Sequence, residues 1–142
     1  MLITNHVLQG ALVGTLAPGP GSAFALGIAS HVVADALPHW GDQPLEEVMH
    51  VAVADGLIGL GTMAWVLRRT PPERRQRVFA GMAGACLPDA DKPAGVFFGV
   101  SPFPAVVDRF HAVIQRESRH RKPQEIACAV VAALVVRRLS RG

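Results

Sequence analysis

Residues 30–40 carry three side chains that can bind a metal ion, at close spacing. His31, Asp35 and His39 follow one another at intervals of four in a segment that is otherwise largely apolar. In a helix, residues i and i+4 lie on one face, so His31 and Asp35 can converge on one point. Pro38 is expected to end or kink that helix, so that His39 approaches the same point from the loop that follows. A buried carboxylate is costly unless a cation or a hydrogen bond compensates its charge, and a divalent metal does so well. The pattern therefore predicts a divalent metal site.

Five further donor groups are expected to complete one or two sites with this motif: His6, Asp55, Asp89, Asp91 and His111. Asp55 needs a partner from elsewhere, because no residue from Val51 to Gly59 offers it an opposite charge. The other groups have simpler alternatives. His6 can be an exposed residue at a helix start, Asp91 can cap a turn, and His111 can pair with an acidic residue one turn earlier.

A donor set of histidines and carboxylates without thiolates favours zinc, with manganese or iron as alternatives. The carboxylates would allow either one ion or two ions bridged by Asp35. Such sites activate water and most often serve the hydrolysis of phosphoesters. We therefore assign catalytic roles to Asp35 and Asp55, and phosphate binding to Arg109, for which a plain surface cation is the alternative.

Helices must position these groups, because the sequence has no sustained period-2 alternation. Periodicity and proline positions predict six helices, over residues 5–16, 22–37, 44–69, 71–87, 104–119 and 123–139. Ser22 is expected to cap the second helix, and basic residues to close the third, fifth and sixth. The fold class predicted is all-α, a single-domain helical bundle over residues 1–142 with a central cleft lined by His and Asp.

Two of the predicted helix ends resemble each other. Leu37-Pro38-His39 and Leu87-Pro88-Asp89 each end a helix and then present a ligand-type side chain. Pseudo-symmetric halves would place His39 and Asp89 at equivalent lips of one cleft. Chance similarity in an alanine-rich chain is the alternative.

Charge and hydropathy divide the chain. Residues 1–67 hold five acidic residues and no Lys or Arg, whereas the remainder holds all 14 basic residues. Half of the residues are hydrophobic, yet residues 51–67 contain Asp55 and three glycines, and residues 126–136 are too short to span a bilayer. We expect a soluble or peripherally attached protein, either cytoplasmic or associated with the inner membrane, with an integral membrane protein as the alternative.

The basic residues gather at expected helix ends and in the tail: Arg68, Arg69, Arg74, Arg75, Arg77, residues 116–122, Arg137, Arg138 and Arg141. They serve either helix dipoles and solubility or an anionic membrane surface. His50 follows two glutamates by one turn, and His120 lies among basic residues, so both are expected at the surface. The basic residues lack interleaved aromatics and no glycine-rich phosphate loop is present, so nothing indicates a specific nucleic-acid partner.

The motif His31-x3-Asp35-x2-Pro38-His39 resembles the H-x3-D-x2/3-P-x-H element of the zinc-dependent phospholipase C and single-strand nuclease superfamily, although Pro38 and His39 are adjacent here. Other segments look like pieces of uncharacterised bacterial proteins described as membrane-bound metal-dependent hydrolases: Thr4-Asn5-His6 with Gly10, residues 87–91, and Arg109-Phe110-His111. A basic-Gly-x-T-H segment of those proteins is reduced to residues 108–111, and the order of the elements differs.

The resemblance implies an all-helical fold, a zinc cluster, and ligands at the matching positions His6, His31, Asp35, Asp89, Asp91 and His111. From all these features, the sequence predicts a metal-dependent hydrolase of a small-molecule or lipid phosphoester. One alternative is a non-catalytic, membrane-associated helical protein whose His and Asp side chains hydrogen-bond between helices. Another is a helical metal-binding protein for storage, sensing or a structural role.

Overall fold

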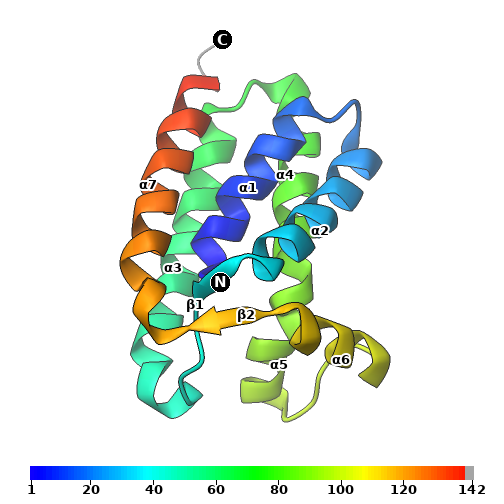
Figure 1. Cartoon of the computed structure of the whole chain (residues 1–142). Coiled ribbons are helices and arrows are strands. Elements are labelled where there is room, and N and C mark those ends of the chain that lie inside the picture. Colours follow the sequence, from blue (N-terminus) through cyan, green and yellow to red (C-terminus); the bar gives the residue numbers. More distant parts are fainter. Residues whose placement is uncertain (140–142) are drawn as a thin grey trace.

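The computed structural model describes residues 1–139, and helices make up most of it (Figure 1). In chain order the helices are α1 (Ile3–Leu16), α2 (Pro20–Ala36), α3 (Leu45–Arg69), α4 (Pro72–Cys86), α5 (Asp91–Phe98), α6 (Ala105–Ile114) and α7 (Lys122–Leu139). The 3-10 turns η1 (Leu87–Ala90) and η2 (Arg119–Arg121) and the strands β1 (Pro38–Trp40) and β2 (Arg116–Ser118) connect them. The predicted all-α bundle is confirmed; Arg141 lies outside the described residues.

Helix α1 lies in the middle of the bundle and packs against α2, α3, α4 and α7. Its apolar side chains Val7, Leu8 and Ala11 form the centre of the buried core. The other core residues are Val66 of α3, Val78 and Met82 of α4, and Val136 of α7. This core is small, and it leaves the polar face of α1, which carries His6, free to contribute to a site.

Glycines bring the backbones of α1, α2 and α4 into direct contact. A Cβ atom at Gly10 would lie 2.5 Å from the carbonyl oxygen of Gly81, and one at Gly27 would meet that same oxygen. These glycines have no side chain to keep the backbones apart, so the three helices pack unusually closely and leave no room for a larger residue. As a result, the rings of His6 on α1 and His31 on α2 stack with their centroids 4.0 Å apart.

One predicted helix start is wrong and one short helix was missed, both for local reasons. Helix α2 begins at Pro20, not at Ser22, and Gly19 is its N-cap. The Ser22 hydroxyl accepts a hydrogen bond from the Gly19 amide and donates one to the Gly19 carbonyl. Ser22 therefore braces the helix start from inside the first turn. Helix α5, over residues 91–98, was not predicted, and it ends on Gly99, which has the positive φ of +72° that glycine adopts readily.

The predicted helix over residues 104–119 is also wrong in its second half. Helix α6 ends at Ile114, and β2 then pairs in parallel with β1, with His39 opposite Glu117. Consequently the basic residues after position 115 do not close α6. A strand of three residues is too short for its own sequence to specify, so this pairing depends on the packing around it.

Gly81→Ala tests the backbone contact between α1 and α4. The new methyl group would meet the carbonyl oxygen of Gly10, so the free energy of unfolding should fall by about 1–3 kcal/mol. The matched control is Gly61→Ala in α3, where nothing lies within 4 Å of the added carbon. That variant should gain about 0.5–1 kcal/mol from helix propensity. Thermal unfolding measures both, and equal midpoints for the two variants would contradict the packing argument.

Candidate metal centre

The carboxylate of Asp35, in the last turn of α2, is the centre of the site and is completely buried. His31 lies one turn earlier on the same face, with its Nε2 atom 3.1 Å from Asp35 Oδ2. His111 of α6 reaches the same oxygen with its Nε2 atom at 3.2 Å. The predicted convergence of His31 and Asp35 is therefore present, and a third element supplies the next donor.

Asp89 in η1 completes a set of four donors with these three residues. One ligand atom from each of His31, Asp35, Asp89 and His111 lies within 4.8 Å of all the others. The separations include 3.0 Å between the Nε2 atoms of His31 and His111, and 3.6 Å between His111 Nε2 and Asp89 Oδ1. Ligands at ~2.1 Å from a tetrahedral zinc ion would lie ~3.4 Å apart. The four groups could thus hold a divalent ion with little movement.

Outer contacts orient the histidines so that their Nε2 atoms face Asp35. The Nδ1–H group of His31 donates to the Ala85 carbonyl at 2.8 Å, and that of His39 donates to the Leu37 carbonyl at 2.8 Å. Asp91 Oδ2 lies 3.7 Å from His111 Nδ1. Since a carbonyl can only accept, the neutral rings of His31 and His39 carry lone pairs on Nε2. Metal-binding histidines are typically held in this way by second-sphere acceptors.

His6 and His39 approach the other oxygen of the Asp35 carboxylate. His6 Nε2 lies 3.3 Å from Oδ1, and His39 Nε2 lies 4.0 Å from it. Both side chains are completely buried. Helix α2 ends at Ala36, just before Pro38, so the predicted turn that brings His39 back toward Asp35 is confirmed.

Electrostatics at the site are dominated by burial and by mutual contacts. Burial would raise the pKa of Asp35, but contacts with His111, His31 and His6 outweigh it and hold that pKa far below its usual range. Burial lowers the pKa of His6. In His31, burial acts in the same direction, but Asp35 and Asp89 outweigh it and raise the pKa.

No Lys or Arg side chain of residues 1–139 pairs with Asp35 or Asp89. Their charges are therefore met by imidazoles, by the amino group of Met1 at 3.5 Å from Asp35 Oδ1, or by a bound cation.

Asp55 is buried as predicted, but its partners differ from those expected. Its carboxylate accepts hydrogen bonds from the amides of Ile3 and Thr4 and from the Thr4 hydroxyl, at 2.5, 3.3 and 2.6 Å. No histidine or arginine of residues 1–139 pairs with Asp55, and the group of side chains that could hold a metal ion does not include it. Asp55 therefore caps the start of α1 from α3, where a carboxylate satisfies free amides and complements the helix dipole.

Glu125 of α7 reinforces this cap and was missed by sequence reasoning. It is buried, and it accepts hydrogen bonds from the Leu2 amide at 3.2 Å and from the Asn5 side chain at 2.7 Å. Together Asp55 and Glu125 fix the first turn of α1, in which His6 lies. The one signal in the sequence for its buried role was the position of Glu125, an acidic residue near the start of an apolar helix.

Arg109 is not brought to the cluster. It is exposed on α6, two residues from His111 and so on the opposite side of the helix. Gln115, which the sequence reasoning also missed, does reach the site, with its Nε2 atom 3.4 Å from Asp35 Oδ2. Its position four residues after His111 was the available signal. His50 and His120 are exposed, as expected.

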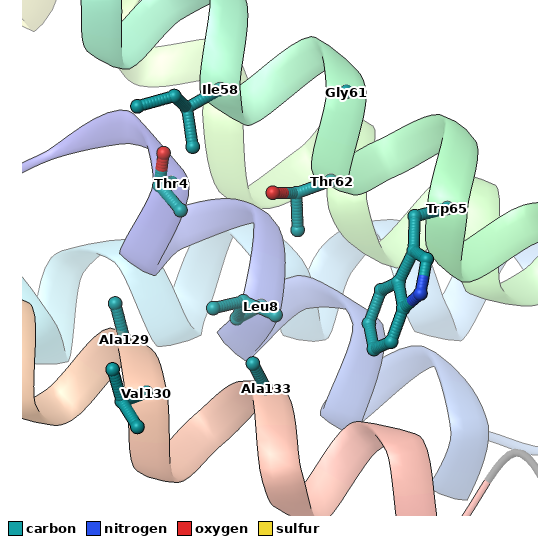
Figure 2. A pocket seen from close by; sticks show the side chains of 9 residues that line it. All are labelled: Thr4, Leu8, Ile58, Gly61, Thr62, Trp65, Ala129, Val130 and Ala133. Atoms are coloured by element: carbon teal, nitrogen blue, oxygen red, sulfur yellow. The ribbon is translucent and has the colours of Figure 1, made fainter.

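An apolar groove of about 410 Å³ lies on the other side of α1, between α3 and α7 (Figure 2). Thr4 and Leu8 of α1 form its floor, and Ile58, Trp65, Val130 and Ala133 line its walls. Residues 4 and 8 face away from residue 6 on a helix, so the groove is separate from the His/Asp cluster. No titratable side chain lines the groove. The chemistry of the site therefore belongs to the cluster.

No protein-family model matches this chain, and no curated protein or solved structure is significantly similar to it. The interpretation of the site therefore depends on its own geometry.

Asp55→Ala tests the capping role. The change leaves buried amides of α1 without an acceptor, so the free energy of unfolding should fall by about 2–4 kcal/mol. Glu73→Ala, at an exposed position in the first turn of α4, removes a carboxylate from solvent and should cost less than about 1 kcal/mol. Chemical denaturation measures both. A folded Asp55→Ala protein of parental stability would contradict the cap.

Proposed function

We propose that this protein is a metal-dependent hydrolase of the phosphoester-cleaving type, with its active centre at His31, Asp35, Asp89 and His111. The supporting observation is the convergence of four imidazole and carboxylate donors on one point, within 4.8 Å of one another. Asp89 keeps 14% of its side chain exposed, so the centre is open to solvent on that side. An accessible coordination position is what distinguishes catalytic from purely structural metal sites.

The donor chemistry favours zinc, with manganese and iron as alternatives, because the set contains imidazole and carboxylate and no thiolate. Burial raises the pKa of the Cys86 thiol, at the end of α4, to about 12, and Cys86 is not one of the four convergent donors. A divalent ion at the centre would supply the activation of a water molecule near neutral pH.

Residues of the chain itself have distinct tasks in this proposal. Asp35 provides the buried negative charge that attracts the ion, and Ala85 fixes the ring of His31 through its carbonyl. Asp91 orients His111. Lys92, whose ammonium group lies 2.8 Å from Asp91 Oδ2, takes the place of Arg109 as the side chain that we assign to a phosphate group.

Asp35→Asn tests the hydrolase. The amide keeps the shape of the carboxylate but loses its charge, so metal content and turnover should both be lost while helical content is kept. The matched control is Asp42→Asn, at an exposed position before α3, which should keep both. The measurements are elemental analysis and the hydrolysis of chromogenic phosphomonoesters and phosphodiesters, before chelation, after chelation, and after zinc or manganese is restored.

Three outcomes separate the hypotheses. Chelator-sensitive hydrolysis that depends on Asp35 supports the proposal. Stoichiometric metal without hydrolysis of any phosphoester would favour a storage, sensing or structural metal protein. A protein that contains no transition metal after purification without chelators, and that hydrolyses nothing, would favour the non-catalytic membrane-associated alternative.

We also propose that the protein attaches to a lipid bilayer, because large apolar side chains cover much of its surface. Among residues 1–139, α3 is the one helix long and apolar enough to cross a membrane, and only 11% of its most apolar window is buried. Val53, Leu57, Ile58 and Leu60 of α3 are exposed, as are Ile126, Val130, Val131 and Leu134 of α7. Soluble proteins rarely leave so much apolar surface open to water.

Basic residues lie where such apolar helices end: Arg68 and Arg69 close α3, and Arg137 and Arg138 close α7. Arginine at the edge of an apolar surface favours the headgroups of anionic lipids. A phosphoester that carries acyl chains is accordingly the substrate class that joins this surface to the proposed metal centre.

Flotation with lipid vesicles tests the attachment. The protein should float with vesicles that contain anionic lipid, less so in high salt, and Leu57→Ser/Leu60→Ser should reduce the floating fraction several-fold by removing apolar contacts. Gly56→Ser, beside those positions with nothing within 4 Å of an added carbon, serves as control. A protein that stays in the aqueous fraction without detergent would contradict the proposal.

A further inference from the structure

The apolar groove between α3 and α7 carries opposite charges at its two ends. Intervals of three or four residues keep side chains on one face of a helix, and such a stripe on α3 consists of Asp55, Ile58, Thr62, Trp65 and Arg69. The three middle members of the stripe line the groove. The stripe therefore begins at a buried carboxylate, follows the groove and ends at an exposed guanidinium group.

Helix α7 repeats this order on the other wall, with a stripe of Glu125, Ala129, Ala133 and Arg137 at intervals of four. Glu125 is buried, the two alanines line the groove, and Arg137 is exposed. Helices α3 and α7 run in the same direction on either side of α1 (Figure 1). The two carboxylates therefore lie at one end of the groove, beside the first turn of α1, and the two guanidinium groups lie toward the other end.

The acidic end needs no ligand, whereas the basic end has free charge. The hydroxyl of Thr4, which lines the groove, already donates a hydrogen bond to Asp55 at 2.6 Å. At the other end, the Cζ atom of Arg69 lies 5.3 Å from the centroid of the Trp65 ring. No Asp or Glu side chain of residues 1–139 forms an ion pair with Arg69 or Arg137. An anionic group would find a partner at this end only.

The size of the groove favours a single chain of methylene groups. Its volume of about 410 Å³ lies at the low end for small-molecule sites. From Ile58 to Trp65 it follows α3 for ~10 Å, and an α-helix of that length and ~10 Å diameter would fill about 800 Å³. Ile58 and Val130 on the two walls are 58% and 54% exposed, so the groove is open along its side and a chain can enter laterally (Figure 2).

We infer that the groove binds one acyl chain of an anionic lipid, with the headgroup on Arg69 and Arg137. The headgroup would lie at the far end of α1 from the turn that holds His6, so this lipid is a ligand other than the proposed substrate. The inference is independent of the proposed hydrolysis. It adds one defined lipid site to the proposed contact of α3 and α7 with a bilayer.

Tryptophan fluorescence with single-chain carboxylates below their micelle concentration tests the site without vesicles. In the Trp40→Phe variant, Trp65 is the sole tryptophan. 2-Bromododecanoate should quench it saturably at one molecule per chain, and more strongly than 12-bromododecanoate does, because Trp65 lies one turn from Arg69. Each methylene group removed from the chain should weaken binding about fourfold, as expected for buried methylene groups.

Two kinds of variant test the two parts of the site. Ala133→Phe fills the groove, and Arg69→Gln/Arg137→Gln removes the partners of the carboxylate, so each should weaken dodecanoate binding at least ~10-fold. The matched controls are Ala127→Phe, at an exposed position of α7 outside the groove, and Arg116→Gln, at an exposed position of β2. Both controls should bind dodecanoate as the parent protein does.

Four results would overturn the inference. Stronger quenching by 12-bromododecanoate would reverse the assigned direction of the chain. Binding that Asp35→Asn abolishes and Ala133→Phe retains would place the carboxylate at the metal centre. A parent protein that binds no dodecanoate and forms a dimer that Ala133→Phe dissociates would assign the groove to a second copy of the chain. Equal binding by the parent and all variants would show an unspecific apolar contact. Should Ala133→Phe lose helical content, the comparison of the two brominated chains decides the question.

Discussion

The rest of the structure depends on burying the carboxylate of Asp35. A carboxylate without solvent is costly unless charge or hydrogen bonds compensate it, and the first 67 residues contain no Lys or Arg to do so. Compensation comes instead from histidines on several separate elements. α1, α2, β1 and α6 each direct one imidazole at this carboxylate. The fold is therefore organised around a polar centre as much as around its apolar core.

Two devices hold α1 in the position that this centre requires. Glycine contacts hold α1 at Gly10 and α2 at Gly27 against Gly81 of α4. The two helices are thereby brought together, and His6 of α1 stacks on His31 of α2. The carboxylates of Asp55 and Glu125 fix the start of the helix by binding its free amides. Both devices act through the backbone, which explains why a chain with a small core can place a histidine ring accurately.

The proposed chemistry and the proposed location are linked by the distribution of side chains. Polar and titratable groups gather at the cluster, whereas α3 and α7 expose apolar residues and enclose the apolar groove over α1 (Figure 2). A soluble enzyme of this length would normally bury more of its large apolar residues. A bilayer would cover the flanks of α3 and α7 and leave the cluster, on another side of α1, to act on headgroups.

The sequence by itself determined the features that follow from helical period and chain breaks. The spacing of His31 and Asp35 specified a shared helix face, and Pro38 specified the end that frees His39. The same period places Arg109 opposite His111 and Gln115 on the face of His111, a signal that the assignment of Arg109 to phosphate binding overlooked. The absence of a local counter-charge indicated that Asp55 is buried, but not what it binds. Its partners are backbone amides, which every residue carries and which therefore leave no mark in composition.

Only the tertiary structure decided which histidine faces which oxygen. The short pairing of β1 with β2, and the early end of α6 that allows it, depend on contacts between segments almost 80 residues apart. The Ala85 carbonyl that fixes the tautomer of His31 is likewise a product of packing, whereas the Leu37 carbonyl that fixes the tautomer of His39 lies only two residues away. Local sequence sets the direction of a side chain along its own helix, but the geometry of a shared centre is set by how separate helices approach one another.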